Sequence, residues 1–249
     1  MRYSVVVPYF RTPEITRICL YSIYKFARGE PEVIVVDNGP NAADSSMLKE
    51  FARSIIIKNP TELRGSAANF EAVDLGLARA SHDLVALIHS DTIFLKEGWD
   101  TKSFSHLEKH RLAALGTFER EANPFRPPRQ RMRDALRHLR HERRPSLRSK
   151  GKLMMHFLLT RKSTLAELGF VFGRGDQLTP AHFAPTGRPV EVLSLVHVSR
   201  LIWHTSNITS LLTGQMDDPA LRATYLEKRA RFIGNPKIRA LFGPVLPRE

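Results

Sequence analysis

The chain has a single cysteine, Cys19, and lacks any apolar run of membrane-spanning length. One cysteine excludes an internal disulfide and fits a reducing compartment, so we expect a cytoplasmic protein. A transmembrane helix needs about 20 mainly apolar residues, and no such stretch is present. The amino terminus enters an apolar strand pattern at once, and we therefore expect no signal segment.

Two glycine-rich phosphate-binding signatures are also missing. No GxGxxG follows the first predicted strand, and no GxxxxGK[ST] occurs anywhere in the 249 residues. Dinucleotide dehydrogenases and P-loop NTPases depend on these loops, because only glycine lets the backbone approach the phosphates closely. Both classes are therefore disfavoured.

Acidic residues are few relative to basic ones, which leaves a formal net charge of +13. Segment 119–152 holds twelve Lys/Arg and four Asp/Glu, so it carries most of that excess. Aromatic residues are scarce there, with Phe125 alone, which makes nucleic acid an improbable partner. Apolar residues recur at helical spacing within the segment, at Met132, Ala135, Leu136 and Leu139.

This spacing predicts a short basic amphipathic helix, of the kind that lies on an anionic membrane surface. A solvated loop that packs its apolar stripe on its own domain explains the same pattern equally well. We therefore expect residues 119–152 to form a basic insert that is partly helical or disordered.

Apolar strand patterns alternate with helical ones along the rest of the chain. Predicted strands cover 3–7, 33–36, 55–57 and 84–88, with helices beginning at Pro13, near Met47 and at Gly65. This βαβαβαβ order is typical of a doubly wound, mostly parallel sheet flanked by helices. Further expected elements are strands at 112–118, 152–160 and 190–198, a helix at 163–168, and two carboxyl-terminal helices broken at 234–236.

Polar residues follow two of the apolar strands directly. Asp37 follows the strand at 33–36, and His89, Ser90 and Asp91 follow the strand at 84–88. Because parallel strands open at one edge of the sheet, both carboxylates are expected in the same crevice. A carboxylate there can hold a divalent cation on a phosphate, although Asp91 as a turn-capping residue is an equal alternative.

These motifs resemble family 2 glycosyltransferases, which have the GT-A fold. The resemblance rests on VVVPYF at 5–10, VDNGP at 36–40, the segment 65–69, the HSD of 89–91 and Gly98-Trp99, in the family's order and spacing. It implies that Asp37 contacts the base of a sugar nucleotide and that Asp91 is the metal-binding residue of a DxD motif, with His89 in place of the first Asp. The nucleotide-binding residues that it implies are Pro8, Tyr9, Asp37, Gly65, Asn69 and Ser90.

The same resemblance implies roles for two later residues. Asp176 precedes Gly187 by eleven positions, which is the family's spacing for the catalytic base, although Gly175 stands where the family has a first acid. His204 is similar to the histidine that closes over the diphosphate and its metal, and His197 is a weaker candidate. Asp176 as a turn residue and His204 as a core histidine remain the alternatives.

The resemblance thus implies an inverting transferase that uses a nucleotide-diphosphate sugar, with a UDP-sugar favoured, and Mg²⁺ or Mn²⁺ held by Asp91 and His204. The acceptor is expected to be a saccharide or a lipid-linked molecule in bacterial surface polysaccharide or glycolipid assembly. Segment 124–150 would then contact the inner face of the plasma membrane. The expected division is a nucleotide-sugar half at 1–118, the basic insert at 119–152, an acceptor half at 153–212 and a helical extension at 213–249.

Two other functions remain open at this point. A sugar-1-phosphate nucleotidyltransferase shares the broad architecture, but residues 8–13 lack the glycines of its loop after the first strand. A catalytically inactive, membrane-docking module would explain His89 and Gly175, the two departures from the family motifs.

Overall fold

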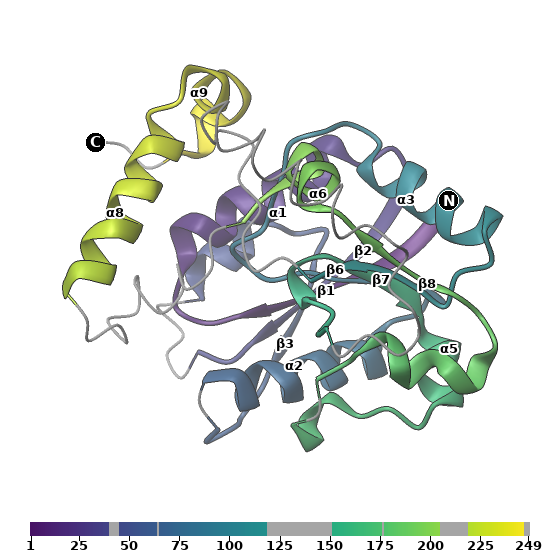
Figure 1. Ribbon diagram of the computed structural model, residues 1–249. Coiled ribbons are helices and arrows are strands. Elements are labelled where there is room, and N and C mark those ends of the chain that lie inside the picture. Colours follow the sequence, from purple (N-terminus) through teal and green to yellow (C-terminus); the bar gives the residue numbers. More distant parts are fainter. Residues whose placement is uncertain (40–44, 64, 119–150, 176, 205–218, 247–249) are drawn as a thin grey trace.

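The computed structural model describes residues 1–39, 45–63, 65–118, 151–175, 177–204 and 219–246 (Figure 1). The predicted basic helix and Asp176 lie outside these residues. Among the helices described, none combines the length and the apolar character needed to cross a bilayer.

A seven-stranded sheet in the order β3-β2-β1-β4-β7-β6-β8 forms the centre of the molecule. Its strands are β1 Arg2–Tyr9, β2 Glu30–Asp37, β3 Ile55–Lys58, β4 Leu84–Leu87, β6 Ala114–Thr117, β7 Leu158–Arg161 and β8 Val190–Leu193. The first four pair in parallel, β8 pairs in parallel with β6, and β7 runs antiparallel between β4 and β6. The expected mostly parallel sheet is confirmed, with β7 as its reversed member.

Helices cover both faces of the sheet (Figure 1). Successive strand residues point to opposite faces, so Val5 and Val7 pack with the helices α1 Pro13–Phe26 and α3 Trp99–Lys109, whereas Val6 packs with α2 Gly65–Arg79 and α5 Lys162–Glu167. The 3₁₀ helices are η1 Ser46–Glu50, η2 Met155–Phe157, η3 Phe172–Arg174, η4 Pro180–Thr186 and η5 Gly243–Val245.

The carboxyl-terminal elements pack on the α1 face. A second, two-stranded sheet pairs β5 Ile93–Phe94 with β9 Ile202–Trp203, and β9 follows α6 Leu195–Leu201 directly. The predicted pair of terminal helices is present as α8 Pro219–Ile233 and α9 Pro236–Phe242, and the Asn235 side chain caps the second helix by accepting a bond from the Lys237 amide. Phe242 lies against the α1 residues Tyr21 and Phe26.

Three predicted element types or bounds were wrong. The run 190–198 is not one strand, because the Ser194 side chain accepts a hydrogen bond from the His197 amide and so starts α6. His197 therefore lies on a helix. The strand expected at 152–160 begins only at Leu158, after η2, and the helix expected near Met47 is the 3₁₀ turn η1.

The first strand is longer than expected, since it continues through Pro8 to Tyr9. The Val6 carbonyl accepts from the Ile88 amide on the β4 side, and the backbone of Pro8, two residues on, faces that same side. The pairing of β1 with β4 ends at Val6, so the missing amide hydrogen of Pro8 breaks no ladder bond.

Helix α2 approaches the sheet closely at Gly76. A Cβ atom added there would lie 2.3 Å from Val6 Cγ1 and 3.3 Å from Val36 Cγ2, both on buried strand residues. We expect Gly76→Ala to destabilise the fold by about 1–3 kcal/mol through overpacking, although alanine has the better helix propensity.

Chemical denaturation measures this, and Ala78→Gly at an exposed position of α2 isolates the propensity effect. If Gly76→Ala raises the free energy of unfolding by as much as Ala78→Gly lowers it, the close approach of α2 and β1 is not real.

Candidate active site

The turn after β4 holds the first two residues of the site. The Thr92 amide donates to the His89 carbonyl at 3.0 Å, which closes a tight turn around Ser90 and Asp91. Ser90 and Asp91 are buried, and His89 is half-buried. The Cys19 thiol of α1 lies 3.6 Å from the His89 carbonyl and ties the turn to the α1 face. The predicted strand-end carboxylate is thus part of an ordered turn at the carboxyl edge of the sheet.

A second segment reaches this turn through the reversed strand β7. The register pairs Leu87 with Leu158, so His156, two residues earlier in the chain, falls opposite His89. The Thr92 hydroxyl donates to the His156 carbonyl at 3.2 Å and holds η2 against the turn. His156 is fully buried as a result.

The two-stranded sheet of β5 and β9 brings a third segment to the turn after β4. The pairing of Ile93 with Trp203 places His204 beside Thr92, next to Asp91. His204 Nε2 lies 3.2 Å from Asp91 Oδ1, and both residues are buried. Phe232 of α8 stacks on Trp203 at a centroid distance of 3.9 Å, so the carboxyl-terminal helix supports this arrangement from behind.

Three imidazoles therefore gather beside the turn that holds Asp91. Each of His89, His156 and His204 offers a ring nitrogen, and these atoms lie within 4.8 Å of one another. The rings of His156 and His204 stack with centroids 4.0 Å apart and planes 11° apart. Neither ring nitrogen of His156 has a hydrogen-bond partner among the described residues, which costs about 1–3 kcal/mol for a buried polar group.

The protonation states suit a cation site. Burial lowers the pKa of His89 to about 4, with Asp91 opposing that shift and His204 adding to it. Burial, together with His204 and His89, holds the pKa of His156 well below its usual value. Burial raises the pKa of Asp91, but His204 and His89 outweigh it, so the net shift is downward. At neutral pH the two imidazoles are uncharged and the carboxylate is ionised, which are the forms that bind metals.

Sequence reasoning found only part of this cluster. It placed Asp91 and His204 together and treated His89 as a departure from a motif, but it missed His156. The one available signal was a polar residue inside the apolar run MMHFLL at 154–159. Such a histidine is ordinarily a core residue, and only the β4–β7 register shows that it faces His89.

The second predicted strand-end carboxylate, Asp37, lies at the same edge two strands away. It is fully buried and accepts hydrogen bonds from the Gly39 amide, the Ser45 hydroxyl and the Lys58 ammonium group. Tyr9 lies opposite it in the β1–β2 register, and the Tyr9 carbonyl accepts from the Asn38 amide. The carboxylate therefore orders the end of β2.

The start of α2 is tied to the same strand end. Asn38 Nδ2 donates to the Ala68 carbonyl at 3.4 Å, and Asn59 Nδ2 donates to Asn38 Oδ1 at 2.8 Å. Gly65 begins the helix with a positive φ of 59° and is exposed, and Asn69 is half-buried one turn on. The structure thus brings the start of α2 next to the strand end that carries Asp37.

Asp176 lies outside the described residues, but the segment that leads to it is anchored. Asp74 of α2 accepts hydrogen bonds from the Phe172 and Gly173 amides at 3.0 and 2.7 Å. Gly175 follows with a φ of +82°, a conformation that favours glycine over the acidic residue found here in the family. The backbone explains this departure from the motif.

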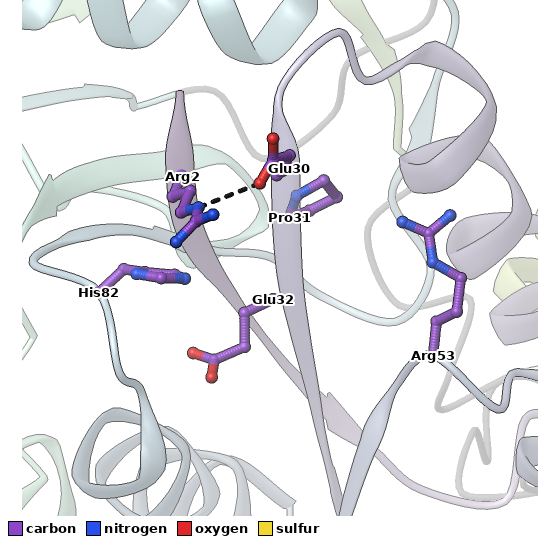
Figure 2. Close-up of a pocket in the computed structure, with 6 residues that line it drawn as sticks. All are labelled: Arg2, Glu30, Pro31, Glu32, Arg53 and His82. Atoms are coloured by element: carbon purple, nitrogen blue, oxygen red, sulfur yellow. Dashed lines mark hydrogen bonds and ion pairs between the residues drawn. The ribbon is translucent and has the colours of Figure 1, made fainter.

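A hollow of about 420 Å³ lies at the opposite edge of the sheet (Figure 2). Its lining comes from the amino ends of β1 and β2 and from the loop before β4, and Arg2 there pairs with Glu30 at 3.0 Å. Ligands of open α/β sheets bind at the carboxyl ends of the strands, so this hollow is not part of the site.

Comparison with known proteins agrees with the fold. The family model for glycosyl transferase family 2 matches residues 4–169. No curated protein matches the chain. Among solved structures, S. aureus TarS 1-349 in complex with UDP is 17% identical, with a TM-score of 0.56, over 96% of this chain and 73% of that one.

A mannosyltransferase from Pyrobaculum calidifontis, in complex with GDP-Man and Mn²⁺, is 13% identical, with a TM-score of 0.55, over 98% of this chain and 74% of that one. The chain spans 44% of the longer TarS structure. At these identities the solved structures establish the fold alone. The family model, however, covers more than half of the residues, and the chain therefore belongs to glycosyl transferase family 2.

Proposed function

We propose that the protein moves a sugar from a nucleotide-diphosphate donor to an acceptor hydroxyl, with inversion at the anomeric carbon. The observation that carries this proposal is the buried Asp91–His204 pair at the carboxyl edge of a family 2 sheet, where His89 and His156 each offer a ring nitrogen within 4.8 Å of one on His204. TarS structures hold UDP or UDP-GlcNAc, and the mannosyltransferase holds GDP-Man with Mn²⁺, which supports a nucleotide-sugar donor of the same kind.

The donor's nucleotide would lie along β1, β2 and α2. A carboxylate offers about four acceptor positions, and three described donors use Asp37, so capacity remains for an N–H of a base. Uracil has such a group, in keeping with the expected UDP-sugar. Pro8, Tyr9, Gly65, Asn69 and Ser90 would line the path between base and diphosphate.

A divalent cation, Mg²⁺ or Mn²⁺, fits the residues beside the diphosphate position. Asp91 supplies an ionised oxygen and His204 an imidazole, and buried His156, whose ring nitrogens have no partner among the described residues, offers a nitrogen within 4.8 Å of one on His204. When bound, such an ion neutralises charge that develops on the leaving diphosphate. The protein's part is to hold Asp91 and His204 rigid, which the β5–β9 pairing does.

Asp176 would act as the general base. It takes the proton from the acceptor hydroxyl while that oxygen attacks the anomeric carbon from the face opposite the diphosphate. A single displacement inverts the centre, so no covalent nucleophile is needed. Asp74 supports this role at a distance, because its two backbone hydrogen bonds fix the η3 segment that leads to Asp176.

The acceptor is proposed to be a saccharide or a lipid-linked molecule in bacterial surface polysaccharide or glycolipid assembly. The basic segment 124–150 would draw the protein to the inner face of the plasma membrane. Each Lys or Arg near an anionic surface contributes about 1 kcal/mol, so a cluster of them suffices for reversible association.

Donor binding tests the proposal directly. Calorimetry with UDP and with GDP, in Mn²⁺ and in EDTA, is expected to show metal-dependent binding, followed by slow hydrolysis of one sugar nucleotide when a panel is screened. Asp91→Asn should weaken metal-dependent binding while leaving the fold intact. Absence of binding under every condition would instead support a module without catalysis.

Replacement of the base tests the chemistry. Asp176→Asn is expected to lower transfer on the order of 10²–10⁴-fold with donor affinity close to unchanged, because the proton acceptor is lost and the diphosphate site is not. Product formation and UDP calorimetry measure the two effects. Glu97→Gln removes an exposed carboxylate and serves as the control. Full turnover in Asp176→Asn would show that another residue is the base.

Removal of the basic segment tests the membrane contact. Deletion of residues 124–150 should reduce sedimentation with anionic vesicles and leave the thermal unfolding midpoint nearly unchanged, since the described core lies outside the deleted stretch. Neutral vesicles are the control. Equal sedimentation of parent and deletion variant would exclude this role.

A further inference from the structure

The packing around residue 156 does not explain why this residue is a histidine. Its ring is buried and stacked on His204, yet both ring nitrogens lack hydrogen-bond partners among the described residues. A phenyl ring would stack equally well and would leave no buried polar atom unsatisfied. The imidazole nitrogens face His89 and His204, whose own ring nitrogens lie within 4.8 Å.

The separations are close to those of ligands that share one ion. With metal–ligand bonds of about 2.0–2.2 Å, neighbouring ligand atoms stand roughly 3.0–3.4 Å apart and opposite ones roughly 4.2 Å apart. His204 Nε2 and Asp91 Oδ1 are 3.2 Å apart, which matches neighbouring ligands. The three imidazole nitrogens lie within 4.8 Å of one another, which is somewhat wider than the separation of opposite ligands.

The donor types are unusual for a magnesium site. Mg²⁺ is a hard ion that prefers carboxylate, carbonyl and water oxygens, whereas imidazole suits transition metals such as Mn²⁺, Co²⁺ and Zn²⁺. Asp91 supplies the carboxylate of this cluster. The other three donors are nitrogens, one of them in the place of the motif's first Asp.

We propose that His89, Asp91, His156 and His204 form a nitrogen-rich metal site that takes a transition-metal dication in preference to Mg²⁺, with His156 as a metal ligand. The inference rests on the proposed function and specifies which class of divalent cation the enzyme would bind. Two of the four residues, His89 and His156, are additions to the Asp and His that the family resemblance implies.

Metal titration without any sugar nucleotide tests the site itself. The full chain is stripped with a chelator and titrated with MnCl₂, CoCl₂, ZnCl₂ and MgCl₂ by calorimetry, and the Co²⁺ protein is examined by visible absorption. One equivalent of Mn²⁺, Co²⁺ or Zn²⁺ should bind at least about tenfold more tightly than Mg²⁺, with affinity increasing from Mn²⁺ to Co²⁺, and Co²⁺ should show ligand-field bands.

Two variants assign the ligands. His156→Phe should weaken Mn²⁺ and Co²⁺ binding by about 10–100-fold or more and change the Co²⁺ spectrum, while the metal-free variant unfolds at or above the parent's midpoint. His156→Gln is the second variant if the phenyl ring prevents folding. His89→Asp exchanges a nitrogen for an oxygen and should shift the relative affinity toward Mg²⁺.

The control addresses surface histidines. His106 near the end of α3 and His110, the residue that caps this helix, have rings 4.4 Å apart and could bind metal adventitiously. His110→Gln should therefore leave the titration unchanged. Equal affinity for Mg²⁺ and Mn²⁺, unchanged binding in His156→Phe, or loss of binding in His110→Gln would each overturn the proposal. Because the titration contains no sugar nucleotide, its result does not depend on sugar transfer. The metal site can be confirmed even if transfer is never detected. Conversely, transfer can be detected even if the preference for transition metals is absent.

Discussion

The gathering of His156 and His204 at the turn that holds Asp91 depends on two strand registers that join distant parts of the chain. The β4–β7 ladder places η2 against the turn after β4, and the β5–β9 pair brings the end of β9 to the same turn. A slip of one residue in either pairing would turn the histidine to the other face of its strand. The apolar residues beside each histidine lie in the core, and their burial is what holds the registers.

This dependence gives the carboxyl-terminal helices a structural link to the site. Phe232 stacks on Trp203, and Phe242 packs on the aromatic residues of α1, so α8 and α9 hold β9 against β5. The same α1 carries Cys19, which contacts the turn at His89. A segment with no evident chemistry of its own thus contributes to the rigidity of the residues that would hold a cation.

The edge of the sheet divides into two kinds of polar site. Around Asp37 an amide, a hydroxyl and an ammonium group all point at one carboxylate and order the end of β2. Around Asp91 the balance is different, because three imidazoles gather there and one of them has no hydrogen-bond partner among the described residues. A buried polar group without a partner needs an explanation, and a bound ligand is one.

The sequence by itself determined the alternation of strands and helices, the positions of Asp37 and Asp91 after buried strands, and the membership implied by motifs in the first hundred residues. These features are local, because an apolar run and the polar residue that ends it are adjacent in the chain. It also predicted the pairing of Asp91 with His204, but only through family resemblance.

Only the tertiary structure decided that β7 is reversed, that His197 belongs to a helix and that His156 faces His89. The stretch VLSLVHV at 192–198 reads as a strand until Ser194 caps a helix within it. The run at 154–159 likewise gives no sign of which strand it will pair with. Pairing between segments about 70 residues apart is set by burial across the whole sheet, and that information is not present in either segment alone.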